Sequence, residues 1–171
     1  MQTKGKTLKY IVTAAMFAAI IAVFTAYLFH VPITIGSNTA YLHFGDAFIF
    51  LAASLLPPGF AVPAAMIGGG LADVLCGSAV WAPFTIVVKG TMAFCFTAKG
   101  QKILCKRNLL ALLPCLVVTV SVYYIAEAVI YGNWAAPLLS IWGNVVQIVG
   151  SGILYALLAA GCDRAKLKRL L

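Results

Sequence analysis

All but one of the 12 lysine and arginine residues of this chain lie in three short clusters, separated by long apolar stretches. The clusters are Lys4, Lys6 and Lys9; Lys99, Lys102, Lys106 and Arg107; and Arg164, Lys166, Lys168 and Arg169. Hydrophobic residues make up 63% of the 171 residues and charged residues only 9%, which is too apolar for a water-soluble domain of this length. The pattern therefore predicts a protein embedded in a lipid bilayer.

The three basic clusters also predict how the chain is threaded. Cytoplasmic loops of membrane proteins carry an excess of lysine and arginine, so all three clusters are expected in the cytoplasm, with an even number of spans between them. Because one span takes about 20 apolar residues, residues 10–98 have room for four helices and residues 108–163 for two. We expect an all-α, polytopic membrane protein: a single transmembrane domain over residues 1–171, with six transmembrane helices and both termini cytoplasmic. The helices are expected at about 8–29, 44–56, 60–75, 83–98, 109–131 and 138–161.

Two of these segments have an alternative interpretation. The first apolar run follows lysines, as a signal peptide would, but its length and the lack of a small-x-small cleavage site before Pro32 favour a retained helix. Residues 44–56 are short for a span, and a re-entrant segment is the alternative. The charge map favours a span, because without it the 99–107 cluster would lie outside. The loop 31–43 has no lysine or arginine; it is expected outside, and is long enough to act as a lid.

Four ionisable residues lie within the apolar stretches, all in the half of the bundle that the topology places outside. They are Asp46, Asp73, Lys89 and Glu127. Charges at membrane depth are costly, and they are usually paired or face a water-filled cavity. In one interpretation Lys89 pairs with Asp73 or Asp46 and fixes neighbouring helices. In the other it faces a polar cavity and contacts a solute, and the two roles are compatible.

A polar stripe runs along the last predicted helix. Its members recur at steps of four, three, four and four residues: Ser140, Asn144, Gln147, Ser151 and Tyr155. The preceding helix adds Tyr124, Glu127 and Tyr131. Amides, aromatic rings and a carboxylate facing one another would suit a small planar solute that forms hydrogen bonds. Hydrogen bonding between helices is the alternative.

Tryptophans and alanines each allow two interpretations. Trp81 and Trp134 are expected at the outer interface, as membrane anchors or as stacking partners for a ligand. Small residues four apart on the first helix, Ala14, Ala18, Ala22 and Ala26 with Ala15 and Ala19 beside them, let another helix approach closely. The spacing favours packing within the chain's own bundle over a docking face for a partner.

Signals for an enzyme are poor. Gly5-Lys6-Thr7 resembles the end of a P-loop but has no glycine five residues before it, and there is no G-x-S-x-G sequence. His30 and His43 lack metal-ligand spacing, and the five cysteines form no C-x-x-C pair, so we expect small apolar cysteines and neither metal nor cofactor. The positive charge is explained by topology, which leaves no reason to expect nucleic acid as a partner.

Three stretches resemble the substrate-binding S component of energy-coupling factor (ECF) vitamin transporters, in the hydroxymethylpyrimidine/riboflavin-type branch. They are YLHFGDAFIFLAASLLPPGFAVPAAMIGGGLADVLCGSAVWAPFTIVVKG (41–90), AEAVIYGNW (126–134) and GNVVQ (143–147). The resemblance covers nearly the whole chain. It implies six helices, a loop after the first helix that closes over a vitamin, and a site that opens outward. It also implies a T subunit and two ATPase subunits as partners, and a location in a prokaryotic plasma membrane.

Carried onto this sequence, the resemblance favours solute contacts at Lys89, Glu127, Trp134, Asn144 and Gln147, with His43 and Asn38 from the lid and with Asp73 or Asp46 holding Lys89. It assigns T-subunit docking to Ala14, Ala15, Ala18, Ala19 and Ala22, reversing the interpretation from spacing. The lid has no tryptophan for a thiamine-type stacking contact, and a pyrimidine- or pyridine-like vitamin or precursor is favoured. The alternatives are a self-sufficient ion-coupled carrier with a proton site at Asp46, Asp73 or Glu127, and a purely structural membrane subunit.

Overall fold

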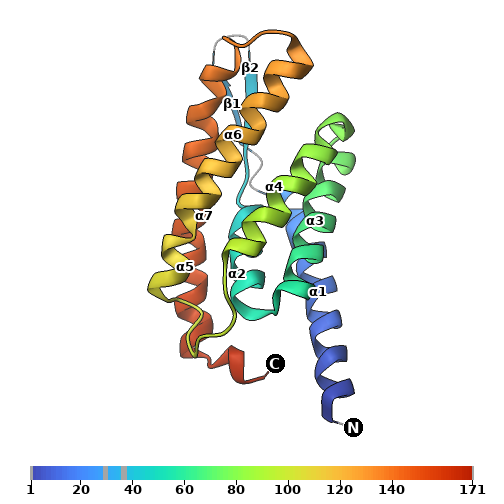
Figure 1. Ribbon diagram of the computed structural model, residues 1–171, viewed down its shortest axis with the longest axis vertical. Coiled ribbons are helices and arrows are strands. Elements are labelled where there is room, and N and C mark those ends of the chain that lie inside the picture. The colour runs from blue at the N-terminus through green and yellow to red at the C-terminus, as the bar shows by residue number, and fades with distance from the viewer. Residues whose placement is uncertain (1, 29–30, 36–37, 171) are drawn as a thin grey trace.

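The computed structural model describes the backbone of residues 2–28, 31–35 and 38–170, and the side chains of residues 5–28 and 43–170. The helices are α1 (Gln2–Ala26), α2 (Gly45–Leu55), α3 (Pro58–Leu75), α4 (Ala82–Cys95), α5 (Lys106–Leu110), α6 (Leu112–Tyr131) and α7 (Pro137–Arg164). Two strands, β1 (Val31–Ile35) and β2 (Asn38–Leu42), and two 3-10 turns, η1 (Ala79–Trp81) and η2 (Leu167–Arg169), complete the described structure. Both chain ends lie at one end of an elongated bundle, and the strands lie toward the other (Figure 1).

Four helical segments among the described residues are long and apolar enough to cross a membrane: Gly5–Ala26, Pro58–Leu75, Lys106–Tyr131 and Ala136–Arg164. The segments Gly45–Leu55 and Ala79–Cys95 are apolar but shorter. A helix the length of α2 extends only about 16 Å, roughly half of the hydrocarbon core. The expected bundle of apolar, membrane-type helices is therefore confirmed, with a two-stranded hairpin added to it, whereas six complete spans are not.

The short helix α2 lies at the centre of the bundle, packed against α1, α4 and α7. Every residue of α2 except Phe48 is buried. The helix ends at Leu55 because Leu56 precedes Pro57 and adopts an extended conformation, as residues before proline usually do. Pro58 then begins α3 at the first helical position, where the missing N–H costs nothing. This central position explains how so short a helix stays out of contact with lipid.

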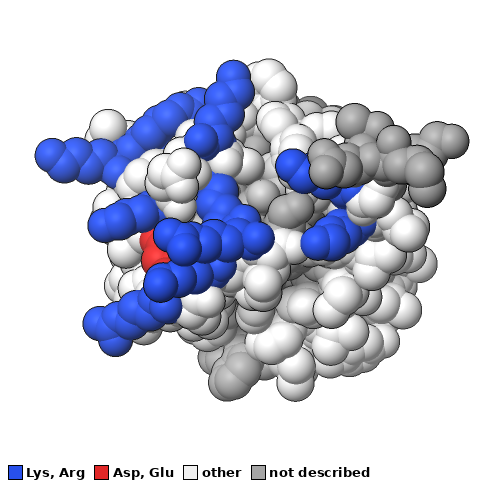
Figure 2. Space-filling model, turned by 90° about the horizontal axis from the view of Figure 1, so that it is seen from below, with Lys and Arg blue, Asp and Glu red and all other residues white. Residues whose placement is uncertain are grey.

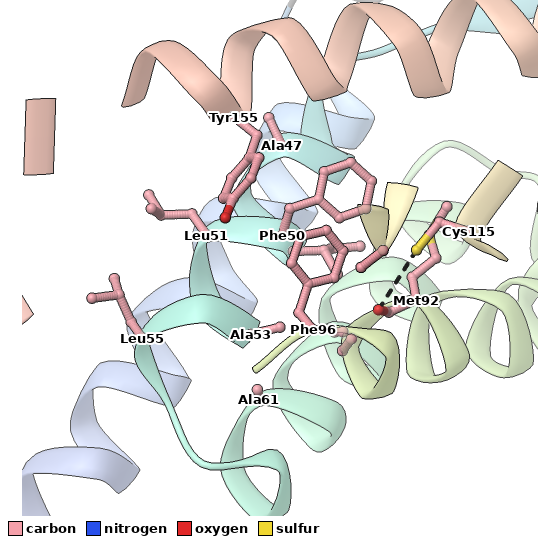
Figure 3. Packing of buried hydrophobic residues seen from close by; sticks show 14 of the residues in the cluster. Ala47, Phe50, Leu51, Ala53, Leu55, Ala61, Met92, Phe96, Cys115 and Tyr155 are labelled. Carbon is pink, nitrogen blue, oxygen red and sulfur yellow. Dashed lines mark hydrogen bonds between the residues drawn. The ribbon is translucent and has the colours of Figure 1, made fainter. Parts of the chain in front are cut away.

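Aromatic rings close the core between α2, α7 and the end of α4 (Figure 3). The rings of Phe50 and Phe96 stack with centroids 4.9 Å apart, and Tyr155 contacts both edge-on, at 6.0 Å and 5.5 Å. Nearby, the buried thiol of Cys115 donates to the carbonyl of Met92 at 3.8 Å. Cys115 thus fills the core as the apolar residue that the sequence predicted.

The segment predicted as a long loop is a β-hairpin within its described residues. β1 and β2 are antiparallel, with Val31 opposite Leu42 and Ile35 opposite Asn38, and both lie against α7. Valine, isoleucine and threonine favour extended backbone, and this tendency outweighs the loop expectation. The hairpin runs beside the upper part of α7 and leads directly into α2 (Figure 1).

A polar clamp holds the connection between α4 and α5. The buried Asn108 amide donates to the carbonyls of Thr97 and Ile103 and to Ser54 Oγ, each at 3.1 Å, and its oxygen accepts from Thr97 N–H at 3.0 Å. Ser54 Oγ lies 2.8 Å from the Tyr155 hydroxyl. The Asp163 carboxylate accepts the N–H groups of Ile103 and Leu104 at 2.8 Å and 3.0 Å. These bonds tie residues 97–108 to α2 and to the end of α7.

The alanine stripe of α1 divides between two surfaces. Ala18 and Ala22 are buried, and Ala26 with them, because α1 packs along α3. At Gly68 of α3 an added Cβ would lie only 2.7 Å from the Ala18 carbonyl oxygen. The chain's own α3 therefore occupies the face at Ala18 and Ala22, and docking of a T subunit at these two residues stays an untested prediction. Ala14 is half-buried, and Ala15 and Ala19 are exposed.

Candidate functional site

A buried ion pair and an amide join three helices in the interior. Lys89 Nζ of α4 donates to Asp46 Oδ1 of α2 at 2.6 Å, and Gln147 Nε2 of α7 donates to Asp46 Oδ2 at 2.8 Å. The exposed fractions of Asp46, Lys89 and Gln147 are 0%, 1% and 7%. Both carboxylate oxygens are thus satisfied away from solvent, as a buried charge requires. We call these three residues the triad.

A glycine on α3 makes room for the lysine. Gly69 lies against the Lys89 stem, so that an added Cβ would be 2.7 Å from Lys89 Cγ and 3.2 Å from Thr85 Cγ2. The middle glycine of the run Gly68–Gly70 therefore allows α3 and α4 to pack closely around a long side chain.

Of the two carboxylates considered for Lys89, Asp46 is the one in contact. Asp73 is half-buried on α3, and its Oδ2 atom is buried with no hydrogen-bond partner among the described residues. Thr85 and Tyr123, which the sequence analysis did not select, share a hydrogen bond of 2.9 Å between α4 and α6. The signal for Thr85 was its position four residues before Lys89, which places both on one face of α4.

A second polar contact lies about two turns along α7 from the triad, toward the hairpin end. Ser140 Oγ of α7 donates to Glu127 Oε2 of α6 at 2.7 Å. Asn144 is half-buried and lies on the same face of α7, between Ser140 and Gln147. No hydrogen bond of its amide is found among the residues whose side chains are described. Glu127 and Asn144 therefore keep hydrogen-bonding capacity for another group.

The two predicted tryptophans occupy different surroundings near this end. Trp134 is 60% exposed, with its ring 6.2 Å from that of Tyr124 and its carbonyl accepting the Tyr124 hydroxyl at 2.8 Å. Trp81 is half-buried and contacts the rings of Tyr123 and Tyr131, at 6.4 Å and 6.3 Å. Trp134 lies on the α6–α7 turn, where Asn133 Oδ1 accepts two backbone N–H groups. The structure does not bring it into contact with the triad.

The remaining predicted residues lie around the hairpin. His43 is half-buried between β2 and α2. The backbone of Asn38 pairs with Ile35 in the hairpin, while its side chain lies outside the described residues. The polar stripe of α7 largely forms bonds between helices: Ser140 contacts Glu127, Gln147 contacts Asp46, and Tyr155 contacts Ser54. Three of the five residues of the stripe therefore form hydrogen bonds between helices, which was the alternative to solute contact.

An open apolar groove lies between α6 and α7, separate from the triad. Its volume is about 360 Å³, and it is lined by Val120, Ser121, Tyr124, Ile125, Leu138 and Ile141. None of the triad residues lines it. The polar groups that could recognise a solute, from the triad to Glu127, lie instead on the inner faces of α2, α4, α6 and α7.

These features define a class of protein before any comparison. Long apolar helices with an ion pair and amides buried inside them are typical of membrane proteins that bind or move small polar solutes. The family model for the S component of the ECF-type riboflavin transporter matches residues 5–164, and the chain belongs to this family. It is a membrane protein of vitamin transport, in a family of transporter subunits rather than of enzymes.

A curated protein from Pyrococcus woesei is also similar. It is described as an uncharacterized protein in the gap 3'region, and it is 35% identical over 134 residues. The match covers 74% of this chain and 88% of the relative.

Proposed function

We propose that this chain is the high-affinity solute-binding subunit of an ECF-type importer in a prokaryotic plasma membrane. In this proposal the chain forms a single transmembrane domain of six membrane-inserted helices, with both termini and the 99–107 segment in the cytoplasm. A T subunit and two ATPase subunits supply the energy. The triad carries the proposal, because it places donors and an acceptor at the inner end of a polar face that continues through Asn144 to Glu127.

The solute that fits this face is a vitamin or precursor with a planar heteroaromatic ring. Lys89 and Gln147 offer donors, Glu127 offers an acceptor and Asn144 offers both, which suits a pyrimidine edge with alternating carbonyl and N–H groups. Riboflavin, named in the description of the family, carries such an edge on its ring system. Trp134, His43 and Asn38 lie toward the hairpin end, where they would cover the other side of the solute.

The first test is a binding titration of the purified protein in detergent. Riboflavin, hydroxymethylpyrimidine, pyridoxine and thiamine are titrated separately while tryptophan fluorescence is recorded, or flavin fluorescence for riboflavin. We expect saturable binding of a pyrimidine-containing or pyridine-type compound. No saturable response to any of the four would contradict the proposed solute class.

Replacing Gln147 with leucine is expected to weaken this binding by roughly 10- to 100-fold. In this proposal the change removes a donor that contacts the solute and also holds the Asp46 carboxylate in place, and hydrogen bonds that involve a charged group contribute about 1.5–3 kcal/mol. Gln101→Leu is the matched control, because Gln101 is exposed in the α4–α5 connection. Equal affinities for the two variants would show that the triad does not belong to the solute site.

A second candidate function is an ion-coupled carrier that works alone, favoured by the buried Oδ2 atom of Asp73, for which the described residues provide no hydrogen-bond partner. Liposomes that contain only this protein separate the two candidates. The proposed function predicts binding without net uptake, and uptake driven by a proton gradient alone would favour the carrier.

Docking to the T subunit is proposed for the exposed alanines of α1. Ala15 and Ala19 share a face with Ile11 and Val23, all exposed, and small residues there would let a partner helix approach. Ala19→Leu is expected to abolish co-purification with a T subunit while leaving solute binding and the unfolding temperature unchanged. The control is Ala79→Leu, at an exposed position in η1. Retained co-purification of Ala19→Leu would place the docking face elsewhere.

A further inference from the structure

The end of the bundle that carries both termini has a concentrated positive charge. Its exposed basic residues come from two segments far apart in the sequence: Lys99, Lys102, Lys106 and Arg107 from the first, and Arg164, Lys166 and Arg169 from the second. We call these seven residues the basic face. Viewed from below, lysine and arginine side chains cover much of this end, with little acidic surface among them (Figure 2).

The Asp163 carboxylate is what brings the two segments together. It accepts the backbone N–H groups of Ile103 and Leu104, so the residues that follow it lie beside the 99–107 connection. Lys102 and Lys106 flank those two N–H groups in sequence, while Arg164 and Lys166 follow Asp163 directly. Both Asp163 oxygens thus accept backbone donors, and no salt bridge from Asp163 to these side chains is found among the described residues.

The charges of the basic face are not neutralised within the described part of the chain. The salt bridge found there is the one between Lys89 and Asp46, in the interior. Arg107 donates to the Cys95 carbonyl, and the neighbouring Lys168 donates to the Ser54 carbonyl, and these are neutral acceptors. Seven basic side chains held in proximity around the single carboxylate of Asp163 leave a net positive surface, which indicates an anionic partner.

Apolar surface begins immediately beside this charge. Leu109, Leu110 and Leu113 follow Arg107 on α5 and α6 and are 41%, 64% and 62% exposed. A phospholipid has complementary groups in the same order: an anionic phosphate to meet the basic residues, followed by acyl chains to meet the leucines. A soluble polyanion or an acidic protein surface would match the basic residues but not the leucines.

We propose that the basic face binds the headgroups of anionic phospholipids, with Lys102, Lys106, Arg164 and Lys166 at its centre. Juxtamembrane basic residues are attracted to anionic lipid by an amount that corresponds to about fivefold in affinity for each side chain. The hydrogen bonds from the N–H groups of Ile103 and Leu104 to Asp163 hold these charges in one place. This distinguishes the basic face from the general excess of basic residues in cytoplasmic loops. The inference does not depend on which solute the chain binds.

The test measures lipid retained by the intact protein. Protein is equilibrated in detergent micelles that contain equal amounts of phosphatidylglycerol and phosphatidylcholine, and bound lipid is counted by native mass spectrometry. We expect phosphatidylglycerol to be preferred, and the preference to fall at high salt because the contacts are exposed. Equal retention of the two lipids would overturn the proposal.

Matched variants locate the effect. Lys102→Gln with Lys166→Gln removes two charges from the basic face, and the preference is expected to fall about fivefold for each. Lys4→Gln with Lys6→Gln removes two charges from the N-terminal cluster and is expected to keep the preference. An equal loss in both variants would overturn a defined site.

Two further results complete the test. Asp163→Ala keeps every basic side chain but removes the two hydrogen bonds that hold Ile103 and Leu104 beside the end of α7. It is expected to lower the preference for phosphatidylglycerol as well. The side chains of Lys102 and Lys166 make no hydrogen bond among the described residues, so their double variant tests the idea even if Asp163→Ala does not fold. A double variant that retains the lipid preference but no longer binds a T subunit or an ATPase would assign the surface to a protein partner instead.

Discussion

Replacing Lys89 with methionine is expected to destabilise the folded protein by about 3–5 kcal/mol, the usual cost of leaving one charge of a buried pair without its partner. Lys89 is 1% exposed and Asp46 is 0% exposed, so water cannot solvate the carboxylate that remains. Gln147 donates only to the other oxygen of Asp46 and cannot replace an ammonium group. Thermal unfolding in detergent should show a large fall in the unfolding temperature.

Neutralising both partners is expected to restore most of this loss. In Asp46→Asn with Lys89→Met neither side chain carries a charge, and removal of a complete buried pair is often close to neutral. The two single variants and the double variant form a cycle whose coupling energy measures the pair directly. Lys102→Met, on the exposed basic face, is the control, and we expect a change of no more than about 0.5 kcal/mol.

The same cycle separates a structural role from a role in binding. If the triad contacts the solute, the double variant regains stability but still binds the vitamin weakly. If the pair only fixes α2 against α4, stability and binding return together. A single variant Lys89→Met with unchanged stability would contradict the burial of the pair itself.

The sequence predicted the type of fold and the buried ionisable residues, but it did not predict which carboxylate contacts Lys89. Apolar runs and clustered basic residues indicate membrane helices because burial in lipid depends mainly on composition and length. Asp46 and Asp73 were both expected near the outer ends of helices beside Lys89, and nothing local distinguishes them. The choice of Asp46 depends on the position of α2 at the centre of the bundle, which is a property of the whole fold.

The remaining differences also concern which surfaces meet. The alanine spacing on α1 correctly indicated a close helix contact, but spacing does not identify the partner, and Ala18 and Ala22 meet the chain's own α3. The contacts of Asn108 and Asp163 with backbone groups of the α4–α5 connection leave no periodic signal in sequence, because a backbone donor can belong to any residue. The structure places Glu127, Trp134 and Asn144 toward the hairpin end, and their roles in binding a solute stay predictions.

Gly68→Ala is expected to have the second large effect, by separating α1 from α3. The added Cβ would lie 2.7 Å from the Ala18 carbonyl oxygen and 2.8 Å from Ile21 Cβ. Neither atom can move without moving the α1 backbone, so the methyl group is not accommodated by a rotamer change. Overpacking of this kind costs about 1–3 kcal/mol, which exceeds the gain of up to about 1 kcal/mol in helix propensity.

Gly59→Ala is the matched control for this substitution. Gly59 is in the first turn of the same helix, and an added Cβ there meets nothing within 4 Å, so this variant should unfold at the same temperature as the unchanged protein or slightly higher. Gly68→Ala should unfold at a clearly lower temperature.

The solute binding of Gly68→Ala should be less affected, because the triad comes from α2, α4 and α7 and not from α1. Because α1 also carries Ala15 and Ala19, association with a T subunit should fall together with stability. Two glycine variants of equal stability would show that α1 and α3 do not approach as closely as the structure indicates.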